Sequence, residues 1–150
     1  MTRVTVRRLA EGSGATWVDA VELLVSEVDR EGELIEREEA EEALVTDTCY
    51  MLVAEIESGG IVGLLSAYSF PDLECGGELV YLYDIEVRED LRGRGIGQSL
   101  VRALLAESSA AGVDLVWAGT DRDNAAARGA FERTGATTAG EAYVEYEWEP

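Results

Sequence analysis

The stretch Arg92-Gly93-Arg94-Gly95-Ile96-Gly97 decides how this sequence folds, and we call it the glycine-rich turn. It follows an apolar segment that ends at Val87 and precedes apolar residues at helical spacing, which predicts a strand, a turn and a helix. Glycines without Cβ atoms let backbone N–H groups approach an anion closely. The helix start adds the positive end of its dipole, and two arginines add charge. The turn therefore predicts a diphosphate site.

Other phosphate motifs fit this turn poorly. A Walker A loop needs Lys-Ser/Thr after its second glycine, and this chain offers Gly95-Ile96-Gly97-Gln98. The dinucleotide fingerprint would need a glycine where Gln98 stands, and it normally opens a βαβ unit at the start of a chain. The structural alternative is a glycine-rich connection whose arginines are incidental.

The charge of the chain is extreme, with 31 acidic against 12 basic residues and a formal net charge of −19. One interpretation is attraction of a cationic substrate or partner. The other is an acidic, salt-adapted protein whose carboxylates hold water and cations, and the spread of acidic residues from Glu11 to Glu149 favours it. Such a charge concerns solubility and steering rather than fold. It argues against nucleic acid, because phosphate backbones require a basic face.

The residue types that are missing limit the chemistry. All 12 basic residues are arginine, so histidine triads, histidine metal ligands, Schiff bases and Walker lysines are excluded. Cys49 and Cys75 are too few for a zinc site, and we expect no disulfide between them and no metal. Acid–base work falls to carboxylates, tyrosines, a cysteine or water.

Hydrophobic periodicity predicts one mixed α/β domain over residues 1–150. No apolar run is long enough to cross a bilayer, and the first residues lack the apolar core of a signal peptide, so we expect a cytoplasmic protein that does not bind a membrane. The 79–87 segment is too continuously apolar for a solvated face, whereas the glutamates around the second helix predict a solvated face rather than an amine-binding lip. Strands are expected near 4–9, 50–57, 61–70, 79–87, 114–118 and 142–148, and helices near 16–28, 33–44, 96–111 and 124–133.

Two separated motifs resemble the GNAT superfamily of acyl-CoA-dependent N-acetyltransferases. Arg92, Gly95 and Gly97 match the pattern Arg/Gln-x-x-Gly-x-Gly/Ala, and the segment from Asn124 to Ala136 is similar to Asn-x-x-Ala-x-x-x-Tyr-Glu-Lys-x-Gly-Phe. The resemblance is close over residues 50–150. It implies a single-domain fold with a mixed, mostly antiparallel sheet, a central parallel pair splayed to admit CoA, and helices on both faces. The 81–87 strand and the 67–71 loop look most like the aminoglycoside 3-N-acetyltransferase branch.

The resemblance also implies acetyl-CoA as the acyl donor. Backbone groups at 85–87 would bond the pantetheine arm and polarise the acetyl carbonyl, while residues 92–98 would hold the pyrophosphate. Asn124 would bind the pantetheine or a nearby water. The implied cofactor-binding residues are Ile85, Glu86, Val87, Arg92, Gly93, Arg94, Gly95, Ile96, Gly97, Gln98, Asn124 and Phe131.

A base must deprotonate the ammonium of the acceptor before it attacks the thioester. Asp84 is the first choice, because burial in an apolar strand would raise the pKa of its carboxyl group. Glu86 would share its face in a regular strand, and a bulge between them would separate the two. Both are expected to bind the substrate. Phe131 stands where the family usually has a tyrosine that protonates the thiolate, so water or another hydroxyl such as Tyr143 must do so.

Three functions remain open at this point. The first is acetylation of a small cationic amine, aminoglycoside-like or a polyamine. The second is acetylation of a protein N-terminus or lysine, and the third is a non-catalytic acyl-CoA-binding or sensing module. The resemblance also implies that a homodimer is possible, because dimers are common in that family, and exposed strand edges near the C-terminus offer a route to one.

Overall fold

The computed structural model describes residues 3–25, 33–140 and 144–150. They contain one sheet in the order β1-β2-β3-β4-β5, antiparallel except for the parallel pair β4–β5. The strands are β1 (Val4–Arg8), β2 (Cys49–Ile56), β3 (Ile61–Pro71), β4 (Glu78–Val87) and β5 (Leu115–Ala118). The helices are α1 (Gly14–Leu24), α2 (Arg37–Leu44), α3 (Ile96–Ala110) and α4 (Ala125–Arg133). A short 3₁₀ turn, η1 (Glu89–Leu91), precedes the glycine-rich turn.

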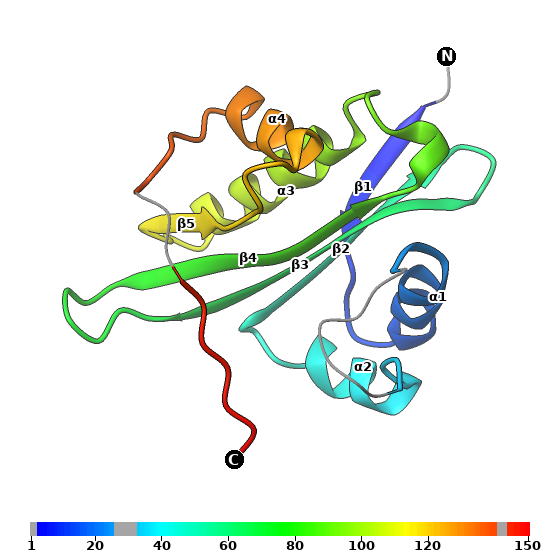
Figure 1. Cartoon of the computed structure of the whole chain (residues 1–150). Coiled ribbons are helices and arrows are strands. Elements are labelled where there is room, and N and C mark those ends of the chain that lie inside the picture. Colours follow the sequence, from blue (N-terminus) through cyan, green and yellow to red (C-terminus); the bar gives the residue numbers. More distant parts are fainter. Residues whose placement is uncertain (1–2, 26–32, 141–143) are drawn as a thin grey trace.

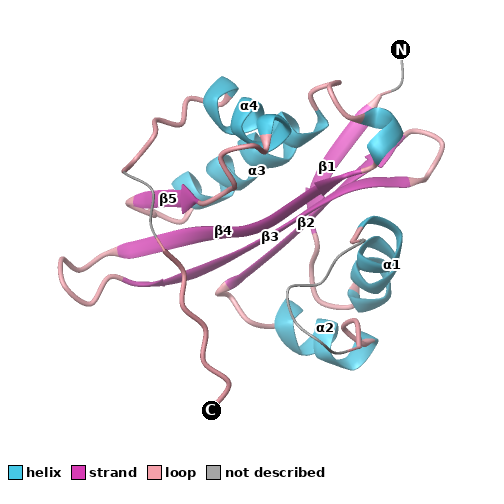
Figure 2. Cartoon of the chain, viewed as in Figure 1, coloured by secondary structure: helices cyan, strands magenta, loops and turns pink. Residues whose placement is uncertain are grey.

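Helices cover both faces of the sheet, as Figures 1 and 2 show, with α3 and α4 on one face and α1 and α2 on the other. Because successive strand residues point to opposite faces, a strand between two helical layers must be apolar throughout. In β2, Leu52 packs between the sheet and α3, in what we call the α3 core. Met51 and Val53 pack between the sheet and helices α1 and α2, in what we call the α1–α2 core. The predicted α/β class, with helices on both faces of a mostly antiparallel sheet, is confirmed.

Helix α3 lies against the sheet where β3 has a glycine. A Cβ atom at Gly63 would be 3.0 Å from Leu100 Cδ1 and 3.3 Å from the carbonyl oxygen of Glu86. The missing side chain therefore lets Leu100, which has no exposed surface, enter the sheet face closely.

The glutamate run of α2 is only partly a solvated face. The Glu41 carboxylate accepts hydrogen bonds from the N–H groups of Gly12 (3.0 Å) and Gly14 (2.7 Å), at the start of α1. Backbone N–H groups at a helix start lack helical partners, so this carboxylate satisfies them and joins α2 to α1.

Two expectations differ from the structure. The strand expected at 142–148 is wrong over Val144–Trp148, which has no regular structure; 142 and 143 lie outside the described residues. Alternating apolar and glutamate residues suit a strand, but a strand also needs a hydrogen-bonding neighbour, and Val144, Tyr146 and Trp148 remain more than 70% exposed. In β4, Tyr83 is 53% exposed, so that strand is not covered on both faces.

The first helix is also shorter than expected within the described residues, because α1 ends at Leu24 and Val25 caps it in an extended conformation. The remainder of the expected span, 26–28, lies outside the described residues. Across the described ranges, no helix combines the length and the apolar character needed to cross a bilayer.

Replacing Leu100 with alanine should lower the free energy of unfolding by about 3–5 kcal/mol, because it leaves a cavity between α3 and the sheet. Urea unfolding followed by circular dichroism measures this. Leu23→Ala on α1 is the matched control: that side chain is 68% exposed, so its loss should cost less than about 0.5 kcal/mol. Equal losses in both variants would contradict the packing described here.

Candidate active site

The parallel pairing of β4 with β5 is short, and β4 extends beyond it. Pairing runs from Leu79–Leu115 to Leu82–Ala118, where β5 ends, while β4 continues to Val87. Beyond Leu82, β4 therefore has its antiparallel neighbour β3 on one side and no paired residue of β5 on the other. This is where the family resemblance implies that the acyl donor enters the sheet.

A β-bulge lies at the same point of β4. Across from it, Ser66 pairs with Asp84 but Ala67 pairs with Leu82, so Tyr83 is the extra residue. The α3 core takes even-numbered residues of β4 before the bulge (Val80 and Leu82) and odd-numbered ones after it (Ile85 and Val87). The bulge therefore shifts by one residue the alternation of side chains between the two faces of the sheet.

The bulge determines the face that Asp84 and Glu86 occupy. It precedes both residues, and the pairing of Asp84 with Ser66 and of Glu86 with Leu64 is regular between them. The two half-buried carboxylates therefore share the face opposite α3, and the bulge does not separate them. Both residues take part in interactions in the folded chain.

Tyr68 on β3 joins this carboxylate-bearing face. Its ring meets the ring of Tyr83 edge-on, with centroids 5.8 Å apart. Burial, and then the neighbouring Cys49, Tyr83 and Asp84, raise the pKa of the Tyr68 hydroxyl above its ordinary value, so the phenol stays protonated at neutral pH. Sequence reasoning missed Tyr68 as a site residue, because only the strand register brings it beside Asp84.

The glycine-rich turn leads directly into α3. Gly93 and Gly95 have φ angles of 76° and 82°, in the left-handed region that side chains disfavour, and Gly95 caps the helix. A Cβ atom on either glycine would meet no atom within 4 Å, so the turn borders open space. The N–H groups of the first helical turn have no helical acceptor, which suits them to an anion.

Arg92 braces this turn against the sheet. Its Nε donates a hydrogen bond to the carbonyl oxygen of Val87 at 3.1 Å. Two residues expected to contact the cofactor are thus bonded to each other. At Gly97, by contrast, a Cβ atom would be in ordinary contact with α4, 3.6 Å from the Cβ of Ala130.

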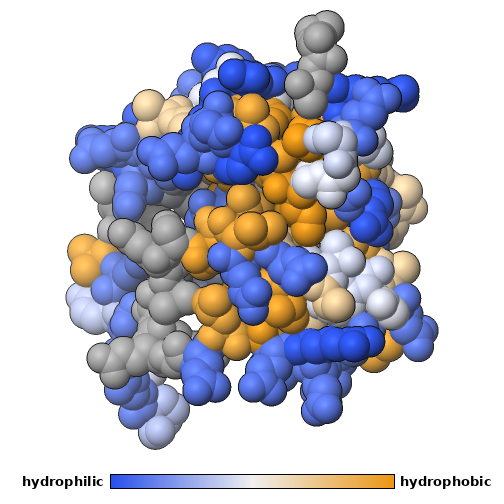
Figure 3. Space-filling view, turned by 90° about the vertical axis from the view of Figure 1, so that its right-hand side faces the viewer, coloured by the Kyte–Doolittle hydropathy of each residue, from blue (hydrophilic) through white to orange (hydrophobic). Residues whose placement is uncertain are grey.

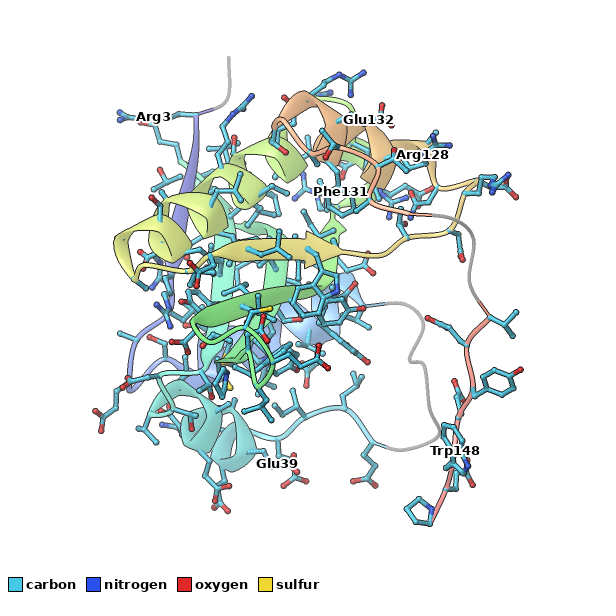
Figure 4. The ribbon with its side chains drawn as sticks, turned by 90° about the vertical axis from the view of Figure 1, so that its left-hand side faces the viewer. Arg3, Glu39, Arg128, Phe131, Glu132 and Trp148 are labelled. Carbon is cyan, nitrogen blue, oxygen red and sulfur yellow. The ribbon has the colours of Figure 1, made fainter. Side chains whose placement is uncertain are left out.

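Helix α4 supplies the other two predicted residues. The Asn124 side-chain oxygen accepts a hydrogen bond from the N–H of Ala127 at 3.0 Å and caps the helix, which leaves its amide nitrogen as the group that can donate to a cofactor. Phe131 packs against the α3 core and lies on the side of α4 that faces the sheet (Figure 4). Tyr143, the predicted alternative proton donor, lies outside the described residues.

Charge is unevenly divided along the chain. Seven of the 12 arginines and seven of the 31 acidic residues lie in the segment 88–133, which holds the glycine-rich turn, α3 and α4. That segment has no net charge, so the other residues carry the whole −19. Within it, the Arg88 guanidinium bonds the Asp90 carboxylate at 2.6 Å and lowers the pKa of that group.

The surface on the side of α1 contains both hydrophobic and hydrophilic areas. Figure 3 shows hydrophobic residues as a central area bordered above and below by hydrophilic ones.

Comparison with known proteins agrees with this architecture. A sequence model of the acetyltransferase (GNAT) family matches residues 17–136. An aminoglycoside acetyltransferase, meta-AAC0020, from an uncultured soil metagenomic sample has a TM-score of 0.84 and 25% identity, covering 97% of this chain and 95% of that one. A ribosomal-protein-alanine N-acetyltransferase from Brucella melitensis biovar Abortus 2308 has a TM-score of 0.74 and 19% identity, covering 97% and 100%.

A third structure similar to this chain contains the cofactor. The aminoglycoside N-acetyltransferase AAC(6')-Iy, solved in complex with CoA, has a TM-score of 0.74 and 16% identity, covering 98% of this chain and 96% of that one. With the family match over most of the chain, these findings identify its class of enzyme. The chain belongs to the acetyltransferase (GNAT) family and is an acetyl-CoA-dependent N-acetyltransferase.

Proposed function

We propose that this enzyme transfers the acetyl group of acetyl-CoA directly to a primary amine of a small cationic substrate. The observation that carries the proposal is the pair Asp84 and Glu86, which share one face of β4 just beyond the point where β5 ends. An ammonium group approaching from that face meets two carboxylates beside the site of the thioester.

Beyond Leu82, the edge of β4 that faces away from β3 suits the cofactor. The gap beyond Leu82 and Ala118 would take the pantetheine arm, bonded by backbone groups of 85–87. Since the Val87 carbonyl already accepts from Arg92, its N–H is the group left for the cofactor. The N–H groups at the start of α3, with Arg94 beside them, would hold the pyrophosphate, and Asn124 would donate its amide to the pantetheine or to a water.

The reaction needs a group that accepts the proton of the amine and a group that donates a hydrogen bond to the oxyanion. Asp84 would take the proton of the ammonium, directly or through water, and the free amine would then form the new N–C bond as the C–S bond breaks. A backbone N–H of 85–87 would stabilise the oxyanion that forms in between. Phe131 has no proton to give, so water or another hydroxyl, Tyr143 among them, would protonate the thiolate.

A small amine acceptor is supported by several similar structures that are aminoglycoside acetyltransferases. One of them, meta-AAC0020, was also solved in complex with sisomicin, at 24% identity and a TM-score of 0.84. Acetylation of a protein N-terminus or lysine is the second candidate. A non-catalytic acyl-CoA-binding module is the third, because Phe131 removes the usual proton donor.

Asp84→Asn should lower kcat by about 10² if Asp84 is the base, because an amide cannot accept the proton. The rate of CoA thiol release with sisomicin as acceptor measures this. Asp47→Asn, which changes an exposed aspartate in the turn before β2, is the control and should keep normal kcat. A normal kcat in Asp84→Asn would remove Asp84 from that role.

Gly95→Ala should weaken CoA binding about tenfold, since a side chain at φ 82° distorts the first turn of α3. Gly112→Ala is the matched control: this glycine follows the other end of α3 at φ 77° and faces similarly open space. Both variants should lose about 1 kcal/mol of stability. Calorimetric titration with CoA should separate them, and equal CoA affinity in the two would argue against the pyrophosphate site.

A panel of amines in 0.1 M and 2 M KCl tests acceptor class and salt adaptation together. If the acidity is a salt adaptation, high salt should raise the urea midpoint, because it screens repulsion among the carboxylates. Thiol release should be fastest with the small cationic amines. Tight CoA binding with no release above background for any amine or peptide would support the non-catalytic module instead.

A further inference from the structure

Five aromatic side chains form one layer on the face of the sheet that bears Asp84. We call Tyr68, Phe70, Tyr81, Tyr83 and Trp117 the aromatic face. The register pairs Tyr81 with Tyr68 on β3 and with Trp117 on β5, so these three rings lie side by side across three strands. Phe70 lies two residues from Tyr68 along β3, which places it on the same face.

The rings touch in an unbroken series. Tyr68 meets Tyr83 at 5.8 Å and 79°, and Tyr83 meets Tyr81 at 6.4 Å and 77°. Tyr81 then meets Trp117 at 5.1 Å and 39°. Trp117 meets Phe70 at 5.4 Å and 90°. These separations and the mostly edge-on angles are those of favourable aromatic pairs, so the layer is held by its own contacts.

The aromatic face is nevertheless open to solvent. Tyr83 is 53% exposed, Tyr68 43%, Phe70 38% and Trp117 36%. Helices α1 and α2 cover the same side of the sheet only farther along, over Met51, Val53 and Leu64, and the β3–β4 arm extends beyond them (Figure 1). A contiguous exposed apolar area of this kind marks a surface that binds something.

One end of the aromatic face lies at the transfer site. Tyr83 is the bulge residue, and Asp84 interacts electrostatically with the neighbouring Tyr68 hydroxyl. From there the face extends to Trp117 and Phe70. Trp117 pairs with Tyr81, which lies three residues from Asp84 along β4, so the two ends are about 10 Å apart along the strand, which matches the length of two linked saturated six-membered rings.

The charges beside the aromatic face favour a cation as its occupant. Asp84 and Glu86 lie on the same side of β4, and aromatic ring faces attract ammonium groups. A second copy of the chain would bring another −19 against these carboxylates. The C-terminal Tyr146 and Trp148 are 75% and 81% exposed and pair with each other at 6.4 Å, so they do not cover the face.

We infer that the aromatic face selects the acceptor: it binds amines carried on linked saturated rings, with the reacting amine at Asp84 and the remote ring on Trp117 and Phe70. This inference rests on the proposed function and adds the residues that would determine specificity. A linear polyamine offers the carboxylates its charge but has no ring to lay on the remote rings, so it gains little from them.

The test compares sisomicin, a multi-ring amine, with spermidine, a linear one. Trp117→Ala should raise the Kd and KM for sisomicin about tenfold, in line with the loss of one aromatic contact. The kcat at saturation and the KM for spermidine should change less than twofold. Trp117→Phe, which keeps a ring, should restore most of the affinity. Trp148→Ala removes a tryptophan of the exposed tail and should change nothing.

Direct binding separates this inference from the proposed function. Calorimetric titration with sisomicin needs no turnover. If wild type binds sisomicin, loses affinity in Trp117→Ala and acetylates no amine, the function fails and the inference holds. If wild type acetylates amines but Trp117→Ala affects sisomicin and spermidine equally, or neither, the inference is overturned. It is also overturned if sedimentation finds a dimer that Trp117→Ala dissociates, because the face would then join two copies.

Discussion

The single extra residue at Tyr83 is the constraint on which the rest of the site depends. By shifting the alternation of β4, it keeps Val80, Leu82, Ile85 and Val87 in one core while it turns Asp84 and Glu86 to the other face. It also lies where β5 ends, so the alternation of β4 shifts at the point where its parallel pairing stops. The acyl donor and the acceptor can then approach the same few residues of β4 from opposite sides.

The division of charge solves a problem that a net charge of −19 creates. CoA is an anion, and a uniformly acidic protein would repel it. The segment 88–133 is neutral because it holds seven of the 12 arginines, and it contains the turn proposed to bind the pyrophosphate. The acidic remainder includes the carboxylates proposed to meet the acceptor. One chain can thus present a tolerant surface to an anion and an attractive one to a cation.

Local signals predicted most of the fold, and long-range pairing explains what they missed. The glycine-rich turn, α3 and α4 follow from glycines, caps and helical spacing, which are read within a few residues. The shared face of Asp84 and Glu86 could not be predicted, because the bulge is defined only by the pairing with β3. Tyr68 was missed for the same reason. The segment Val144–Trp148 alternates apolar and acidic residues as a strand would, but this pattern does not specify a neighbouring strand to pair with. Asn124 was predicted as a cofactor ligand, and its helix-capping bond is visible only in the folded chain.

The bond from Arg92 to the Val87 carbonyl has a chemical consequence for an enzyme that handles a reactive thioester. A guanidinium stays protonated at any physiological pH, whereas the ammonium of a lysine can lose its proton and then becomes a nucleophile. An amine on a side chain near the proposed donor site could take the acyl group itself. Arginine supplies the same positive charge without that reactivity, and the chain contains no lysine at all. A donor site built with arginine, as proposed here, would not be modified by its own substrate.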